Sequence, residues 1–185
     1  AWYCPPYRQY SMAFASPILF CGILNPSLIG GERAMAKYTG EYSETFTVNV
    51  PIDEAKAHFS DLDNIAKCYG DVKSAKKLAK PGTMKLTLNP KTEIGVTFNG
   101  EHTCAWKFKD EHTLEWESNG KGNIVSKGKA TFTPSGKKKT KITYTETMEL
   151  DMEVAFLLRA LIGPIVSKQI REGTKDYLDR MRDLL

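Results

Sequence analysis

The chain has 185 residues and a net charge of +4, and 41% of its residues are hydrophobic and 26% charged. This length suits one domain with a complete core, and the composition is ordinary for a globular protein. The mild charge, with no basic run interleaved with aromatic residues, gives no reason to expect a nucleic-acid partner. The four cysteines are widely spaced and form no CxxC pair or Cys/His cluster, so neither a metal nor a cofactor is expected.

Residues 1–34 differ in character from the rest of the chain. They carry almost no charge, and they include Pro5, Pro6, Pro17 and Pro26. The apolar stretch from Met12 to Leu24 is too short to span a bilayer, so stable membrane insertion is not expected. Because globular patterning starts after Met35, we expect residues 1–34 to be extraneous sequence or a leader that packs poorly. We expect residues 35–185 to form the domain, in the cytoplasm.

The first predicted strand runs from Tyr42 to Val50, because apolar and polar residues alternate there. Pro51 ends it, since proline cannot donate to a strand ladder. Two short helices are predicted next, over Ile52–Ser60 and Leu62–Tyr69, with Asp61 as a candidate N-cap of the second.

The longest alternating pattern in the chain runs from Ile94 to Phe108. A hairpin at Asn99-Gly100 is the obvious alternative, because Asn-Gly is a favoured two-residue turn. The alternation nevertheless passes through that dipeptide without changing phase, so we predict one long strand, bent or bulged at Gly100.

Turn residues separate the other predicted strands, which cover Val72–Leu78, Thr83–Leu88, His112–Ser118, Ile124–Thr133 and Thr140–Met152. Apolar residues at helical spacing predict a helix over Val154–Leu185, kinked or divided at Gly163-Pro164. The predicted fold is therefore α+β. A curved, seven-stranded antiparallel sheet wraps around the long C-terminal helix, and two short helices follow the first strand.

This order of elements resembles the SRPBCC superfamily, also called START-like or helix-grip. The resemblance rests on the block Phe46–Phe59, on Leu114-Glu-Trp116 with Gly128-Lys-Ala130-Thr-Phe132, and on the strand Thr140–Leu150 before the final helix. Within the superfamily the chain is most similar to small bacterial polyketide cyclase/dehydrase-like proteins, including those common in cyanobacteria. The chain has no Rieske-type ligand set and matches no catalytic motif of a cyclase branch.

The resemblance implies a cavity between the sheet and the C-terminal helix. Side chains on the predicted inward rows are the candidate ligand contacts: Phe98, His102, Trp106, Trp116, Tyr144, Glu146, Met148, Leu158, Leu161 and Ile165. His102 and Glu146 interrupt otherwise apolar rows. Burial would lower the pKa of the imidazole and raise that of the carboxyl group, so these two are also candidates for a general acid and base. Ser126 is a further candidate for a polar contact.

Three functions fit this pattern. The favoured one is binding or transport of a lipophilic small molecule such as a lipid, polyketide, quinone or pigment. The second is a polyketide cyclase or dehydratase that uses the same cavity. The third is a protein-interaction module with a filled core, which a cavity too small for more than a few waters would favour.

Overall fold

The computed structural model describes residues 32–185. In chain order, its elements are β1 Arg33–Val48, α1 Ile52–Ser60, α2 Leu62–Cys68, β2 Val72–Lys77, β3 Thr83–Leu88, β4 Lys91–Glu93, β5 Val96–Phe98, β6 Glu101–Phe108, β7 Thr113–Gly122, β8 Ile124–Pro134, β9 Thr140–Ala155, the 3₁₀ turn η2 Phe156–Leu158, and α3 Arg159–Asp183.

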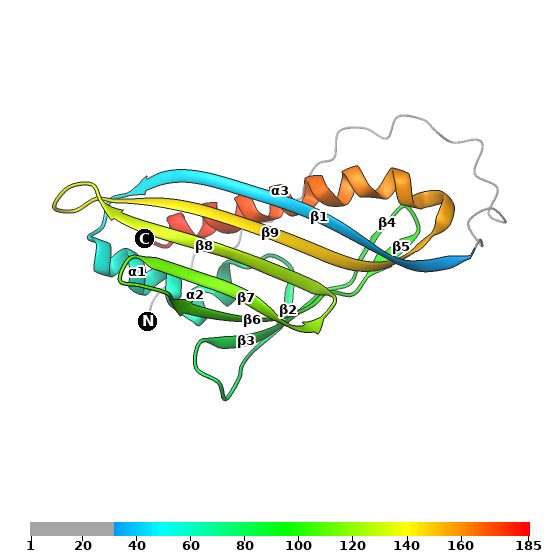
Figure 1. Ribbon diagram of the computed structural model, residues 1–185, viewed down its shortest axis with the longest axis horizontal. Coiled ribbons are helices and arrows are strands. Elements are labelled where there is room, and N and C mark those ends of the chain that lie inside the picture. Colours follow the sequence, from blue (N-terminus) through cyan, green and yellow to red (C-terminus); the bar gives the residue numbers. More distant parts are fainter. Residues whose placement is uncertain (1–31) are drawn as a thin grey trace, which may run out of the picture. The chain divides into compact units, whose positions relative to one another are not determined.

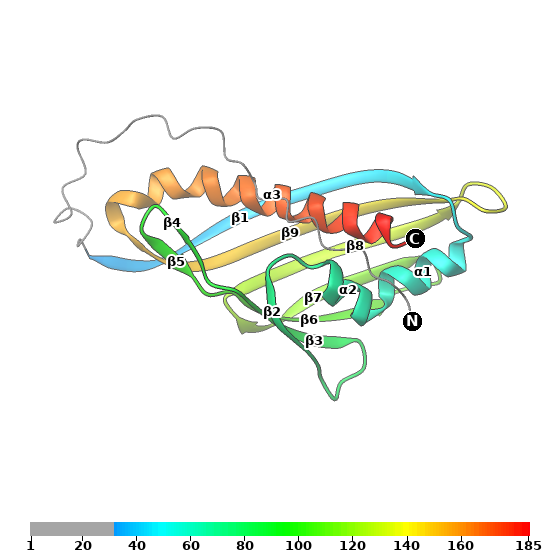
Figure 2. The same cartoon turned by 180° about the vertical axis from the view of Figure 1, so that it is seen from behind.

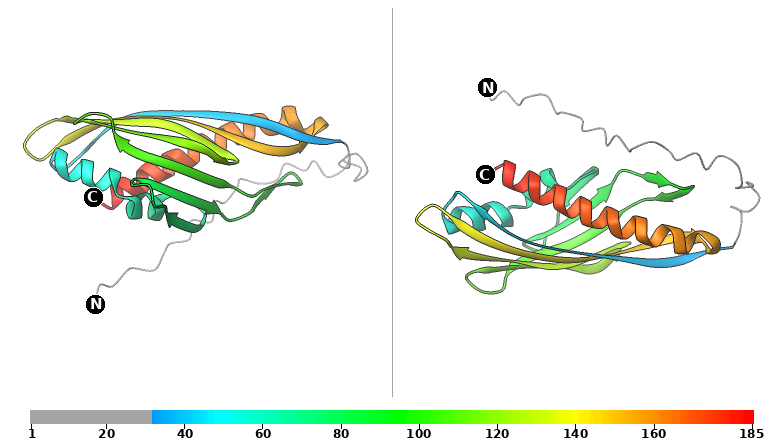
Figure 3. Two further views of the ribbon diagram at one scale, coloured as in Figure 1. Left: turned by 60° about the horizontal axis from the view of Figure 1, so that its bottom comes forward. Right: turned by 90° about the horizontal axis from the view of Figure 1, so that it is seen from above.

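Seven of the strands form one antiparallel sheet in the order β1-β9-β8-β7-β6-β3-β2. The sheet curves around α3, as Figures 1 and 2 show from its two sides. Figure 3 shows α3 lying along the inner side of the curved sheet, with α1 and α2 near its C-terminal end. The predicted α+β fold is confirmed, including the seven strands, the two short helices and the long C-terminal helix.

The first strand is longer than predicted, and its expected start at Tyr42 was wrong. β1 begins at Arg33 and pairs with β9 over its whole length. Its alternation continues back to Tyr38, a buried residue, because the long β9 offers partners that far. Arg33 and Ala34 therefore belong to the sheet, although they were expected in the N-terminal segment. Residues 1–31 lie outside the described part of the chain, and the expectation for them remains a prediction.

The single long strand predicted from Ile94 to Phe108 was also wrong. β5 pairs only with β4, in a separate two-stranded sheet, and β6 starts after a break at Asn99-Gly100. The β4–β5 hairpin turns at Ile94 and Gly95, whose φ angles are 48° and 72°.

A side chain from another strand connection explains this break. Asn123 accepts a hydrogen bond from the Glu101 N–H at 2.8 Å, and its amide donates to the Asn99 carbonyl at 2.9 Å. These bonds satisfy backbone groups that strand pairing would otherwise use. The inward phase is nevertheless kept on both sides of the break, because Val96, His102 and Cys104 are all buried.

β7 extends past Ser118, where the predicted strand ended. Gly120 and Gly122 adopt φ angles of 77° and 110°, which glycine tolerates, and the β6–β7 register shifts at this point. The strand continues through this irregularity, and the chain reverses at Asn123 instead.

The short helices match the prediction closely. Asp61 ends α1 and caps α2, accepting a hydrogen bond from the Asp63 N–H at 2.8 Å. Of the two alternatives predicted at Gly163-Pro164, a kink or a division, the division is wrong, since α3 is one element that includes Pro164. Pro164 lies near the start of α3, so its missing N–H removes one early hydrogen bond and leaves the rest of the helix intact.

The inner side of α3 carries the buried residues Ile162, Val166, Ile170, Thr174, Leu178 and Met181. Residues of α3 contribute to two main clusters of the core. The C-terminal half packs with α1 and the middle of the sheet, around Phe59, Phe132 and Ile142. The N-terminal half packs with β5 and the far ends of β1 and β9, around Tyr38 and Val154. A third, smaller cluster joins α2 to β3.

Candidate functional site

A half-buried carboxyl group on β9, Glu146, is the most unusual polar feature of the inner face, because four side-chain donors surround it. Glu146 Oε1 accepts hydrogen bonds from the Ser126 hydroxyl at 2.6 Å and the Trp116 indole N–H at 3.1 Å. Its Oε2 accepts from the Tyr144 hydroxyl at 2.8 Å and from Thr174 of α3 at 3.5 Å. Glu146 forms no ion pair with any of the described residues.

These contacts set the ionisation of the group. Burial raises the pKa of Glu146, and the four donors oppose that rise because they stabilise the carboxylate. Burial and the nearby Glu146 charge also raise the pKa of Tyr144 well above its usual value. The ionisation of Glu146 therefore depends on the balance between burial, which favours the neutral acid, and the four donors, which favour the carboxylate.

His102 lies on β6 beside this cluster and contacts Glu146 only through two serines. Its Nε2 lies 3.0 Å from the Ser118 hydroxyl, which accepts a hydrogen bond from the Ser126 N–H at 2.8 Å. The Nδ1 atom is buried and has no partner among the described residues. Desolvation lowers the pKa of His102 to about 4, so the imidazole is neutral at pH 7. A direct His102–Glu146 pair, which would favour acid–base catalysis, is not formed.

Aromatic rings fill the space around these polar groups. The Tyr69 ring lies 6.0 Å from His102 and 6.1 Å from Tyr177 between centroids. Trp116 stacks on Tyr144 at 4.9 Å, and Trp106 meets the His102 ring edge-on at 6.5 Å. The deep part of the inner face is thus occupied largely by the protein's own side chains.

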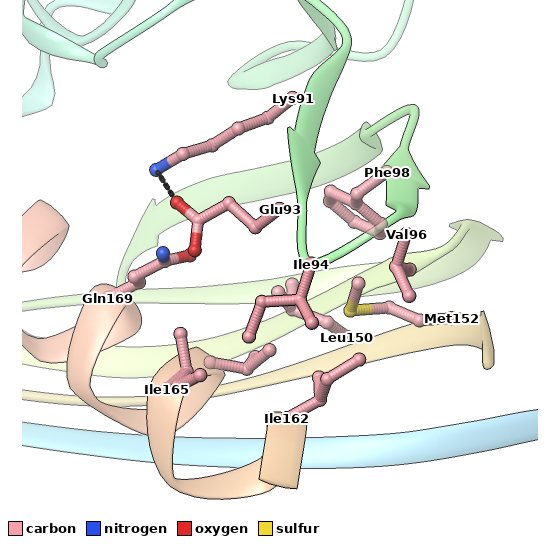
Figure 4. Close-up of a pocket in the computed structure, with 11 residues that line it drawn as sticks. Lys91, Glu93, Ile94, Val96, Phe98, Leu150, Met152, Ile162, Ile165 and Gln169 are labelled. Atoms are coloured by element: carbon pink, nitrogen blue, oxygen red, sulfur yellow. Dashed lines mark ion pairs between the residues drawn. The ribbon is translucent and has the colours of Figure 1, made fainter. Parts of the chain in front are cut away.

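An apolar pocket of about 60 Å³ lies nearer the N-terminal end of α3, between that helix, β9 and the β4–β5 hairpin. Figure 4 shows apolar side chains from all three elements pointing into it. The polar groups, which are the Lys91–Glu93 ion pair and the Gln169 amide, lie to one side. Its apolar walls are formed by Ile94, Val96, Phe98, Leu150, Met152, Ile162, Ile165 and Val166.

The pocket and the Glu146 cluster lie along the same inner face. Leu150 in the pocket wall and Glu146 are four residues apart on β9, about 13 Å at the rise of an extended strand. Val166 and Thr174 span about 12 Å along α3. Met148 and Ile170, which pack in the same N-terminal cluster, lie between the two sites in sequence.

The structure separates the predicted ligand contacts into groups. His102, Trp106, Trp116, Tyr144 and Glu146 gather in the deep polar and aromatic cluster. Phe98 and Ile165 line the pocket, Leu158 is buried in the adjoining cluster, and Met148 packs against that cluster.

Leu161 was wrongly expected on the inner face and is 62% exposed. The reason is the phase of α3, whose inner row contains the neighbouring Ile162. Pattern analysis also missed residues that only the tertiary fold brings in, namely Ser118, Thr174, Lys91, Glu93 and Gln169. Ser126, the weaker candidate, is a central member of the Glu146 network.

A broader hollow of about 1060 Å³ includes many outward-facing residues of β6 to β9. Exposed charged side chains such as Lys107 and Glu117 line it, and pairs such as Lys127–Glu117 at 3.5 Å cross it. Trp106, Trp116 and Glu146 also line this hollow, which is open and carries charges of both signs, unlike the enclosed apolar sites typical of lipophilic ligands.

Residues 32–185 contain neither a candidate metal site nor a candidate membrane-spanning helix. No group of three or more His, Cys, Asp or Glu side chains there is placed to hold a metal ion. None of the helices in this part combines the length and apolar character needed to cross a bilayer.

Comparisons with known proteins agree with this fold. A family model described as polyketide cyclase / dehydrase and lipid transport matches residues 39–185. No curated protein sequence matches the chain.

Several solved structures are similar in fold. A START superfamily protein from Mycobacterium smegmatis is 19% identical, with a TM-score of 0.53 over 77% of this chain and 94% of that one. The Zhui aromatase/cyclase from Streptomyces sp. R1128 is 10% identical, with a TM-score of 0.59 over 79% and 93%. Norcoclaurine synthase from Thalictrum flavum is 11% identical, with a TM-score of 0.53 over 92% and 96%. At these identities the similarity concerns the fold alone.

Proposed function

Because this chain belongs to the polyketide cyclase/dehydrase and lipid transport family, we propose that it binds a lipophilic small molecule between α3, β9 and the β4–β5 hairpin. The apolar pocket carries this proposal. Its walls are aliphatic and aromatic, and its polar groups lie to one side, the pattern typical of sites for apolar ligands. Binding would be driven by burial of apolar area, at about 25 cal/mol per Å².

The size of the pocket implies that the hairpin moves when a ligand binds. About 60 Å³ is well below the ~300–1,000 Å³ typical of ligand pockets. β4 and β5 pair only with each other, so displacing them breaks no hydrogen bond of the seven-stranded sheet. The Asn123 side chain holds the base of the hairpin at Asn99. We therefore expect the movement at the tip of the hairpin, around Ile94 and Gly95.

The test is native mass spectrometry of the full chain after incubation with a mixed lipid and quinone extract. Ile162→Trp places a large ring in the pocket, whereas Leu161→Trp adds the same ring at an exposed position one residue away. We expect ligand adducts on the wild type and on Leu161→Trp, and a loss of at least tenfold in adduct intensity on Ile162→Trp.

Val166→Phe is a second filling variant, in case Ile162→Trp disturbs folding, and thermal melts identify the variants that remain folded. Adducts that survive both substitutions in folded protein would place the ligand elsewhere. No adduct with any lipophilic compound would favour the filled-core interaction module.

The Glu146 network favours a second candidate, a cyclase or dehydratase activity. A carboxyl group whose pKa is raised by burial keeps its proton to higher pH than an exposed one, as a general acid requires. Incubation with β-hydroxy ketones of polyketide type would reveal dehydration as the loss of one water from the substrate mass. Glu146→Gln is expected to abolish that loss, and unchanged turnover in this variant would exclude Glu146 as the catalytic acid.

A further inference from the structure

Two buried hydrogen-bond donors without partners lie beside the apolar pocket. The hydroxyl of Tyr38 and the Nε atom of Arg159 are both shielded from solvent, and neither has a hydrogen-bond partner among residues 32–185. Tyr38 itself is only 8% exposed. Buried polar groups in proteins are nearly always hydrogen-bonded, so each of these two atoms has room for an acceptor that the described residues do not supply.

Tyr38 and Arg159 do not line the pocket themselves, but each neighbours a residue of its wall. Tyr38 on β1 pairs with Leu150 on β9, and Leu150 forms part of the pocket wall. Arg159 opens α3, one turn before the wall residue Ile162. The Tyr38 ring lies against this same first part of the helix, 3.6 Å from where a Cβ of Gly163 would be.

The electrostatics of this corner favour an anion. The positive charge of Arg159 lowers the pKa of Tyr38, although burial has the larger, opposite effect, so the two groups lie within electrostatic range. Arg159 forms no ion pair within the described residues, and its guanidinium group lies over the Phe156 ring at 5.8 Å. The guanidinium group can only donate, because none of its three nitrogens accepts, and the phenol hydroxyl can donate as well as accept.

We propose that Tyr38 and Arg159 bind the acidic end of an amphipathic ligand, a carboxylate or phosphate monoester, whose apolar tail occupies the pocket under the β4–β5 hairpin. This inference rests on the proposed function and specifies its ligand class. An acidic group accepts from both donors, and a charge-assisted bond to arginine is stronger than one between neutral groups. The Glu146 carboxyl group lies about 13 Å along β9 from the pocket residue Leu150. The negative charge of the ligand's acidic end would therefore be well separated from that of Glu146.

The test compares three compounds with one alkyl chain: a long-chain fatty acid, its methyl ester, and the corresponding alkyl phosphate. Affinities are measured by isothermal titration calorimetry on the full chain. Arg159→Gln removes the charge and keeps most of the side chain, and Tyr38→Phe removes only the hydroxyl. Arg171→Gln, at an exposed position on the same helix, is the matched control.

We expect wild type and Arg171→Gln to bind the acid or the alkyl phosphate at least tenfold more tightly than the ester. Arg159→Gln should lose roughly tenfold or more of the affinity for the anionic compounds, and Tyr38→Phe a smaller factor, while neither changes ester binding. Thermal melts of each variant confirm that it is folded.

The outcomes separate the two proposals. Equal affinity for acid and ester in the wild type would overturn the acidic-end site and leave lipophilic binding intact. Failure of all three compounds, with no adducts in native mass spectrometry, would overturn both proposals. Acetate or inorganic phosphate binding as tightly as the long-chain compounds would show a free-anion site and overturn the amphipathic ligand.

Discussion

Protonation of His102 should destabilise the folded protein by an amount that the structure allows us to work out. The imidazole is 1% exposed, its Nδ1 has no partner among the described residues, and burial lowers its pKa from 6.5 to about 4. Between these two pH values the unfolded chain binds a proton at His102 that the folded chain does not. The free energy of unfolding therefore falls as pH decreases from about 6.5 to about 4.

The size of the effect follows from the two pKa values. Each pH unit corresponds to 1.36 kcal/mol, so a difference of about 2.5 units amounts to about 3 kcal/mol. That is a large share of the ~5–15 kcal/mol by which typical domains are stable. The loss should be nearly complete at pH 4 and almost absent at pH 7.

The assay is urea denaturation, followed by tryptophan fluorescence at several pH values from 4 to 7.5. His102→Gln keeps a group that can hydrogen-bond to Ser118 and carries no charge at any of these pH values. We expect the stability difference between wild type and His102→Gln to shrink by about 3 kcal/mol between pH 7 and pH 4.

The other titrating groups are the same in both proteins, so their contributions to the pH dependence cancel in this difference. His112→Gln, at an exposed position, controls for the removal of one histidine. A difference that varies by less than about 1 kcal/mol over the range would refute the reasoning, because it would mean that the imidazole is solvated in the folded state.

Three further outcomes follow from single contacts. Because burial raises the pKa of Glu146, the folded state retains its proton to higher pH than the unfolded chain; stability should therefore fall as pH rises above about 4.5, and Glu146→Gln should remove that decline in a urea series. Gly40→Ala should lower the melting temperature by the equivalent of ~1–3 kcal/mol, since the added Cβ would lie 2.6 Å from Cβ of Ile170; unchanged stability would contradict this packing. Gly173→Ala, with nothing within 4 Å, should instead raise stability by up to ~1 kcal/mol in the same melts.

Periodicity predicted much of the sheet because each strand has one buried and one exposed face. The inward phase of the rows holding His102 and Glu146 was predicted from alternation alone, and both side chains do lie on the inner face. The boundaries that failed depend on contacts distant in sequence. Asn123 breaks the strand at Asn99-Gly100, and nothing within the alternating stretch itself encodes that side chain.

The helix phase shows a different limit. Leu158, the last residue of η2, is followed at helical spacing by Leu161 and Ile165 on α3, and equally by Ile162 and Val166. Helical spacing permits either row to face the sheet, and the choice depends on the shape of β1 and β9 beneath the helix. The structure buries the second row, which is why the pocket wall includes Ile162 and Val166, two residues that the pattern did not select.

The ionisable residues of the candidate site could be predicted from the sequence, but their hydrogen-bond partners could not. Ser118 and Ser126 are ordinary strand residues in the sequence. They become hydrogen-bond partners of His102 and Glu146 only because β6, β7, β8 and β9 lie side by side. A polar network of this kind depends on register, which local patterns do not determine.

The β4–β5 hairpin also has a consequence for how the native state fluctuates. Because its ladder is separate from the seven-stranded sheet, its backbone can open as a small cooperative unit at a cost set by its own few bonds and apolar contacts. Its amide protons should then exchange with solvent through local opening, long before those of β8 and β9, whose exchange requires unfolding of the whole sheet. The hairpin wall of the pocket would thus open more often than the centre of the sheet, at the place where a ligand would enter.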